Sequence, residues 1–237
     1  MTFSIRKIIL LGLTIAFALG PIFSNGFGGF SAESFPVQLE RWPAQPAGWA
    51  FSIWGLIYLL LIATSAGSVL FAQGSDRWNG LFWPLGLSLA LGVFWVEAAM
   101  RSPLLATAMI LPMAATAVLA MLRLRNIWQD WLAVGLYAGW LTAATGVAIS
   151  IIVSGYGVMS PRAAAILLIL VVLIVAFVIT QHRPYIISYR AGVIWALIGV
   201  IAANIQAQDY IIAGLSSVGI ATLLIAGQIF SKRQGQS

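Results

Sequence analysis

The chain has 237 residues, of which 61% are hydrophobic and 8% are charged, and its formal net charge is +6. A soluble domain carries charge on about a quarter of its residues and a disordered chain is poor in hydrophobic residues, so the composition excludes both classes. The absence of cysteine excludes disulfides and thiolate metal sites, and the single histidine, His182, is too few for a histidine cluster. Long apolar runs without alternation predict an all-α, polytopic membrane protein rather than a β-barrel.

About 20 apolar residues in a helix cross the hydrocarbon layer of a bilayer, and eight segments of the chain meet that requirement. Their approximate ranges are 8–24, 47–72, 80–99, 103–122, 131–153, 163–180, 185–205 and 210–230. Arg6 and Lys7 before the first run are also compatible with a signal peptide. No clear small-x-small cleavage site follows that run, which favours a retained helix.

The basic residues predict the orientation, because cytoplasmic loops of membrane proteins are enriched in Lys and Arg. With the N-terminus in the cytoplasm, nine of the 12 basic residues lie inside, namely Arg6, Lys7, Arg77, Arg123, Arg125, Arg183, Arg190, Lys232 and Arg233. Arg41, Arg101 and Arg162 lie outside. We expect both termini in the cytoplasm and an integral protein of the cytoplasmic membrane. Since the basic residues form no patch, nucleic acid is not an expected partner.

The longest connection, residues 26–46, joins the first two spans on the outer side and is rich in Gly, Phe, Pro and Trp. Loops of this length often act as lids over a site. In the alternative interpretation, Phe27, Phe30, Phe35 and Trp42 lie among the lipid headgroups as an aromatic belt. The sequence favours neither.

Few side chains in the spans suit ion or proton chemistry. Both lysines lie outside the spans, and Glu97 is the one acidic residue within a span. Arg101 follows Glu97 by four residues, which predicts a helical ion pair. Arg190 lies near the start of the seventh span, from where it can reach the cytoplasmic surface. A coupled ion transporter is poorly supported, and neither a catalytic nor a metal-ligating set is expected.

Aromatic residues gather in the second and fifth spans. The spacing of Phe51, Trp54 and Tyr58 places them on one helical face. In the fifth span, Tyr137 and Trp140 flank a ridge of small residues, Gly135, Gly139, Thr142, Gly146 and Ser150. Small residues let another helix approach closely, so the aromatics beside them line either a packed interface or a flat apolar cavity.

At these residues the sequence resembles the TspO/MBR family of tryptophan-rich sensory proteins, which includes the mitochondrial translocator protein. The family's second helix reads Pro-Pro-x-Trp-x-Phe and then Trp-x-x-Leu-Tyr, and residues 46–58 here contain Pro-Ala-Gly-Trp-Ala-Phe and then Trp-Gly-Leu-Ile-Tyr. Residues 140–146 read Trp-Leu-Thr-Ala-Ala-Thr-Gly, as in the fifth helix of bacterial members, and Trp95 stands where the third helix has a tryptophan. The likeness covers residues 8–155. We expect a TspO-like five-helix domain over residues 1–157 and an additional three-helix segment over 158–237.

Two departures from the family touch the expected pocket. One residue fewer than in the family separates Phe51 from Trp54. This shift rotates Trp49 about the helix axis by roughly 100° relative to Trp54. Gly92 stands where the family has a polar Asn. The last three spans have no counterpart in the five-helix family.

The resemblance implies binding of hydrophobic ligands, with tetrapyrroles such as protoporphyrin IX and sterol-like molecules as the expected classes. The ligand-binding residues that it implies are Trp42, Phe51, Trp54, Tyr58, Trp95, Tyr137, Trp140 and Ala144. No resident cofactor is expected, and no residue resembles a haem-iron ligand, so a metal-free porphyrin fits better than haem. Porphyrin degradation is linked to the family, which leaves enzymatic turnover as an alternative.

Two further classes remain open besides a sensor or receptor that binds its ligand. The first is a transporter of an apolar or amphipathic small molecule, which helix breaks such as Pro112 favour. The second is a structural module whose last three spans dock a partner protein. Gly86 and Ala90 have the spacing of a small-xxx-small contact between helices, which also permits a homodimer.

Overall fold

The computed structural model describes residues 5–23, 29–71, 79–124 and 128–234. These residues form α1 (Ile5–Phe23), α2 (Ile53–Leu70), α3 (Asn79–Arg101), α4 (Pro103–Leu122), α5 (Trp128–Gly155), α6 (Pro161–His182), α7 (Ile187–Gln206) and α8 (Tyr210–Gln234). Two short 3₁₀ helices, η1 (Ala32–Ser34) and η2 (Gly48–Ser52), precede α2. The prediction of an all-α protein with eight helices is confirmed, and the fourth helix has the bounds that the sequence indicates.

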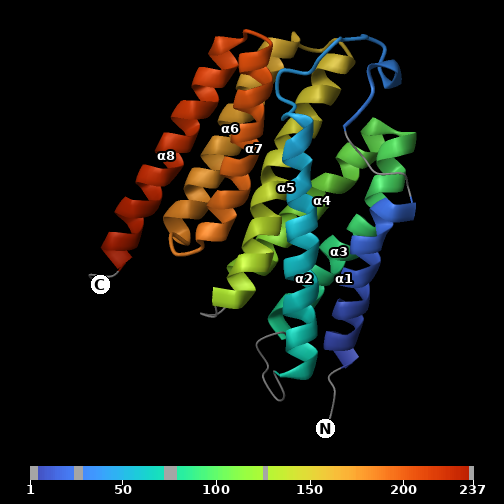
Figure 1. Cartoon of the computed structure of the whole chain (residues 1–237), viewed down its shortest axis with the longest axis vertical. Helices are drawn as coiled ribbons and strands as arrows, with labels where there is room; N and C mark the ends of the chain where they lie inside the picture. The colour runs from blue at the N-terminus through green and yellow to red at the C-terminus, as the bar shows by residue number, and fades with distance from the viewer. Residues whose placement is uncertain (1–4, 24–28, 72–78, 125–127, 235–237) are drawn as a thin grey trace.

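Seven helices within the described ranges are long and apolar enough to cross a membrane, and α1 is not among these seven. Successive helices run in opposite directions, so both ends of the chain lie at the same end of the bundle (Figure 1). We call this the terminal end. The opposite end carries the loop between α1 and α2. The chain is an integral membrane protein.

Serine–proline pairs begin two of the helices. Ser102 Oγ accepts a hydrogen bond from Leu105 N, and Ser160 Oγ accepts one from Ala163 N. The following residue in each case, Pro103 or Pro161, occupies the first turn of its helix, where its missing N–H costs nothing. The chain therefore reverses tightly between α3 and α4, and α6 begins with the same cap.

Helix α5 lies at the centre and contacts α2, α4, α6 and α7, and its pairing with α7 is the most extensive of the fold. The small residues of α5 allow this pairing. A Cβ on Gly139 would lie 2.0 Å from the Tyr189 carbonyl oxygen, and one on Gly146 would lie 2.3 Å from Val172 Cγ2. The predicted ridge thus faces α7 and α6. The division of the chain at residues 157 and 158 stays a prediction, and this packing runs across it.

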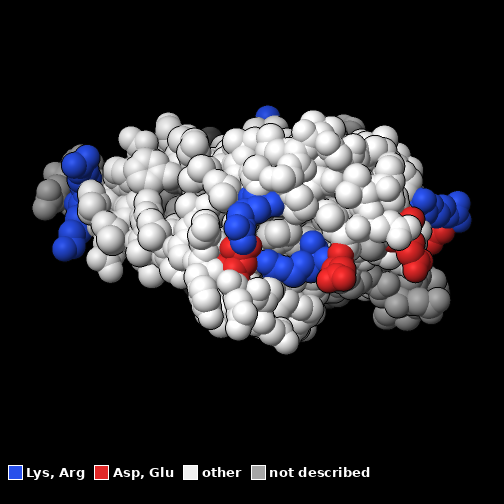
Figure 2. Space-filling view, turned by 90° about the horizontal axis from the view of Figure 1, so that it is seen from above, with Lys and Arg blue, Asp and Glu red and all other residues white. Residues whose placement is uncertain are grey.

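Charged side chains lie mainly at the two ends of the bundle. Figure 2, a view from above, shows basic and acidic side chains beside one another at the loop end. Arg101 Nη2 lies 2.6 Å from Glu97 Oε1, which confirms the predicted ion pair. Asp209, between α7 and α8, lies within 4 Å of two arginines, Arg41 and Arg162.

Candidate functional site

Aromatic side chains from several helices converge inside the bundle. The ring centroids of Trp54 and Trp140 are 6.1 Å apart, with the ring planes nearly perpendicular. Phe51 lies 5.9 Å from the Trp140 ring in the same orientation. Trp54 and Tyr58 stack at 5.4 Å, and Phe17 of α1 meets Tyr58 edge-on at 5.1 Å. These apolar helices thus contribute large, flat surfaces to one region.

A narrow cavity of about 50 Å³, which we call the inner slot, opens among these rings. Its walls are Gly29, Phe30, Gln45, Pro46, Phe51, Trp54, Trp95, Ile110, Trp140, Ala144, Val147, Ala148, Ile151 and Ala196. Five of the ligand-binding residues that the family resemblance implied line this slot together: Phe51, Trp54, Trp95, Trp140 and Ala144. Their side chains come from η2, α2, α3 and α5.

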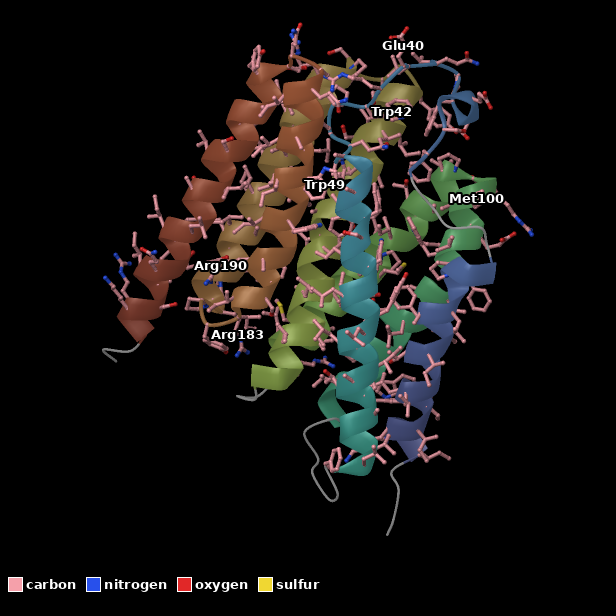
Figure 3. All side chains as sticks on the ribbon, viewed as in Figure 1. Glu40, Trp42, Trp49, Met100, Arg183 and Arg190 are labelled. Carbon is pink, nitrogen blue, oxygen red and sulfur yellow. The ribbon has the colours of Figure 1, made fainter. Side chains whose placement is uncertain are left out.

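Two further cavities adjoin the inner slot. The deep cavity, about 210 Å³, shares Phe51, Trp54, Trp95 and Ile110 with it and is also lined by Tyr58. The outer vestibule, about 620 Å³, shares Phe30, Gln45 and Pro46 with the inner slot and includes Trp42 and Trp49. Figure 3 places Trp42 and Trp49 at the loop end of the bundle. The inner slot therefore lies between an opening at that end and an apolar cavity deeper in the bundle.

Two polar atoms of the inner-slot residues are buried without a hydrogen-bond partner in the described part of the chain: Trp140 Nε1 and Gln45 Oε1. The other indoles nearby differ, because Trp95 Nε1 donates to Ala106 O at 2.9 Å and Trp195 Nε1 donates to Ala50 O at 2.8 Å. An unpaired buried polar group costs about 1–3 kcal/mol. A ligand with a suitable acceptor and donor would remove that cost.

The loop before α2 folds inward over the site. Phe30, Phe35 and Trp42 are all at least nine-tenths buried within the protein. The Phe35 ring packs edge-on at 5.0 Å from Trp42 and at 6.1 Å from Tyr156, in the turn that follows α5. A belt of these three side chains among lipid headgroups is therefore wrong, and their placement agrees with a lid. Phe27 lies outside the described residues.

Polar contacts fasten this loop to α7 and its neighbours. Arg41 donates to Asn204 Oδ1 at 3.1 Å and to Asp209 Oδ2 at 3.4 Å, and Arg162 donates to the same carboxylate oxygen at 3.2 Å. Asn204 Nδ2 donates to Pro43 O at 2.8 Å. A short backbone bond, from Ala47 N to Gly199 O, joins the start of η2 to α7. Helix α7 and the turn that follows it thereby hold the lid in place, and Arg162 of α6 shares the carboxylate of that turn.

Tyr137 supports the site without lining any of the three cavities. It is fully buried, and its hydroxyl lies 2.8 Å from Ser88 Oγ, which also donates to Met113 O. Its ring packs against Phe17 at 5.7 Å. Tyr137 thus positions the aromatic cluster from below, whereas the resemblance implied direct contact with a ligand.

Both departures from the family pattern have visible consequences. A Cβ on Gly92 would lie 2.5 Å from Phe17, so the phenyl ring of α1 occupies the space beside the glycine. Trp49 is 48% exposed and meets Trp195 of α7 edge-on at 5.4 Å instead of entering the inner slot. The site is consequently more apolar at α3 and depends on α7 at its outer rim.

Sequence reasoning missed several residues of the inner slot, among them Gln45, Ile110 and Ala196. Ala196 is the contribution of α7, which the five-helix pattern does not include. A signal was present in the sequence, because Gly192, Ala196 and Gly199 form a second ridge of small residues. In the structure a Cβ on Gly192 would lie 2.7 Å from Trp140 N, and one on Gly199 would lie 2.7 Å from Ala50 Cβ.

A family model described as TSPO-like protein matches residues 3–229, which includes the last three helices. Searches of curated proteins and of solved structures returned no match.

Proposed function

This chain belongs to the TSPO-like protein family, and on that premise we propose that it is a membrane sensor or receptor that binds a mainly apolar small molecule in the inner slot. Tetrapyrroles such as protoporphyrin IX and sterol-like molecules are the classes that fit. The loop from Gly29 to Pro46 covers the site, and the ligand enters by way of the outer vestibule.

The main support for this proposal is that two buried polar atoms in the apolar wall of the inner slot have no hydrogen-bond partner among the described residues. Trp140 Nε1 requires an acceptor and Gln45 Oε1 requires a donor. A porphyrin offers pyrrole N–H groups, carboxylate oxygens and a flat face for the indoles, and a sterol hydroxyl can donate and accept. A purely hydrocarbon ligand would leave both atoms unpaired and would bind more weakly.

The cavity volumes indicate that binding requires a rearrangement. Pockets for drug-sized ligands measure about 300–1,000 Å³, whereas the inner slot and the deep cavity measure about 50 and 210 Å³. Phe51 and Trp54 form part of the wall between the two. Rotation of these side chains would merge the cavities, so we expect the ligand to select a conformation in which they have moved.

Titration of the purified protein with protoporphyrin IX, followed by tryptophan fluorescence, tests the proposal. Trp140→Phe keeps an aromatic ring and removes the N–H, so Kd should rise roughly fivefold or more, which corresponds to about 1 kcal/mol. Trp83→Phe is the matched control, because Trp83 is 73% exposed on α3. Free tryptophan corrects for light absorbed by the porphyrin. Absence of saturable quenching, or an equal Kd for Trp140→Phe and wild type, would contradict the assignment.

We further propose that the terminal end faces the cytoplasm and that the membrane is the cytoplasmic one. The described basic residues are distributed as this orientation requires, with Arg6, Lys7, Arg123, Arg183, Arg190, Lys232 and Arg233 at helix ends on the terminal side. Gly86 is buried against Leu10 and Leu13 of α1. A homodimer through that face would displace α1, so the proposed binding unit is one chain.

A transporter is the second candidate, favoured by the succession of three adjoining cavities. Such a protein would move its ligand from the outer vestibule through the inner slot to the deep cavity and onward. Flux of protoporphyrin IX into proteoliposomes distinguishes the two candidates: a receptor binds the ligand without accumulating it in the lumen, and a transporter accumulates it.

A further inference from the structure

Arg190 is a buried cation far from the ligand site. It lies in the first turn of α7 at the terminal end, where Figure 3 shows it near Arg183. The residue is 8% exposed, and its Nη1 donates to Pro184 O at 2.6 Å. This is the single hydrogen bond of its side chain among the described residues. Its remaining N–H groups are therefore available to another acceptor.

No described carboxylate is placed to neutralise Arg190. Glu33, Glu40, Glu97 and Asp209 all belong to the loop end of the bundle. The side chains of Asp76 and Asp130 lie outside the described residues. A buried cation is stabilised by an anionic partner, and none of the described carboxylates supplies one to Arg190, so a lipid phosphate at this corner would be stabilising.

Helix α8 forms a cradle for the guanidinium group. A Cβ on Gly227 would lie 2.6 Å from Arg190 Cζ and 2.8 Å from its Nε, so the guanidinium occupies the space beside this glycine of α8. One turn further, Ser231 Oγ donates to Pro184 O at 3.4 Å, the same carbonyl that Arg190 uses. Lys232 and Arg233 follow and are exposed. Two helices thus bring guanidinium and ammonium donors to one corner of the terminal end.

We propose that this corner binds the phosphate group of an anionic phospholipid. Oxyanions of a phosphate ester match the charge and the fork of N–H donors of arginine. Basic groups between transmembrane helices near the cytoplasmic surface are suited to lipid headgroups. Helix α8 also exposes Leu224, Ile225 and Ile229, against which acyl chains would lie. A free phosphate ion would share the headgroup contacts and lack these apolar ones.

Native mass spectrometry of the full chain tests the site with defined lipids. The purified protein is mixed with equal amounts of phosphatidylglycerol and phosphatidylcholine that carry the same acyl chains. We expect wild type to retain one phosphatidylglycerol with at least tenfold preference, and Arg190→Gln to lose that preference. Arg101→Gln is the matched control, because this arginine is exposed at the opposite end and pairs with Glu97.

A second variant keeps the charge and disturbs only the cradle. Gly227→Ala should push the guanidinium away and weaken phosphatidylglycerol retention, whereas Gly214→Ala on the same helix meets open space and should not. Equal retention of both lipids by wild type would overturn the proposal. Unchanged preference in Arg190→Gln and in Gly227→Ala would overturn it as well. Displacement of the lipid by millimolar inorganic phosphate would show an ion site rather than a lipid site and would also refute it.

Discussion

Replacing Gly139 by alanine should force α5 and α7 apart, because the two backbones touch at this residue. The new Cβ would lie 2.0 Å from the Tyr189 carbonyl oxygen and 2.9 Å from the Tyr189 carbonyl carbon. A carbon–oxygen contact requires about 3.3 Å, so the helices must separate by roughly 1.3 Å. Since the obstacle is backbone rather than a flexible side chain, no rotamer change relieves it.

Overpacking of this kind costs about 1–3 kcal/mol, and a rigid backbone contact falls at the upper end. For a chain of this size each kcal/mol lowers Tm by about 2–4 °C, so we expect Gly139→Ala to lose about 6–12 °C. Thermal unfolding in detergent, followed by tryptophan fluorescence, measures the change. Gly192→Ala, on the other side of the same contact, should add little to Gly139→Ala, because one separation relieves both clashes.

Gly214→Ala is the matched control, because a Cβ at this glycine of α8 meets nothing within 4 Å. Its Tm should equal that of wild type or rise by up to about 4 °C, since alanine is a better helix former than glycine by about 1 kcal/mol. A Tm for Gly139→Ala as close to wild type as that of Gly214→Ala would refute the close α5–α7 packing.

Three further predictions concern the lid, the aromatic cluster and the orientation. Asp209→Asn removes the carboxylate that Arg41 and Arg162 share, and should lower the free energy of unfolding by about 1–2 kcal/mol, a value discounted for the exposure of both arginines. The control Glu97→Gln, in an exposed ion pair, should change it by less than about 0.5 kcal/mol. Comparable Tm values for the two variants would contradict the anchoring role of Asp209. Ser88→Ala leaves the buried Tyr137 hydroxyl without its partner and should cost about 1–3 kcal/mol in thermal unfolding, and a Tm equal to wild type would show that Tyr137 has another partner. Because the chain contains no cysteine, a single introduced cysteine reports topology without background labelling. An impermeant maleimide applied to intact cells should label Tyr156→Cys, and should label Lys232→Cys only after permeabilisation. The reverse pattern would show that the protein has the opposite orientation.

The helices could be predicted from the sequence because apolar length is a local property. Trp54, Trp95 and Trp140 could be placed in one site because the motifs that carry them belong to a shared helical arrangement. The closure of the site could not be predicted in this way. It depends on Phe17 filling the space beside Gly92, and that contact joins residues far apart in the chain.

The sequence also did not predict that α7 contributes to the site. Nothing in the periodicity of α7 indicates which neighbour its small residues face, since every transmembrane helix is apolar on most sides. The pairing follows from complementary ridges on two helices, Gly135 and Gly139 on one and Gly192 on the other. Such complementarity is a property of three-dimensional packing. For the same reason the fastening of the lid by Asn204 and Asp209 could not be derived from the spacing of charges.

A ligand that occupies the inner slot should be excluded by a side chain that obstructs the slot. Ala144 lines the slot, and Ala221 of α8 is exposed on the outside of the bundle. Equilibrium dialysis of protoporphyrin IX against the purified protein should give saturable binding of one molecule per chain for wild type and for Ala221→Phe. The same measurement on a folded Ala144→Phe should show Kd raised at least tenfold. Equal affinity of Ala144→Phe and wild type would contradict occupation of the slot by the ligand.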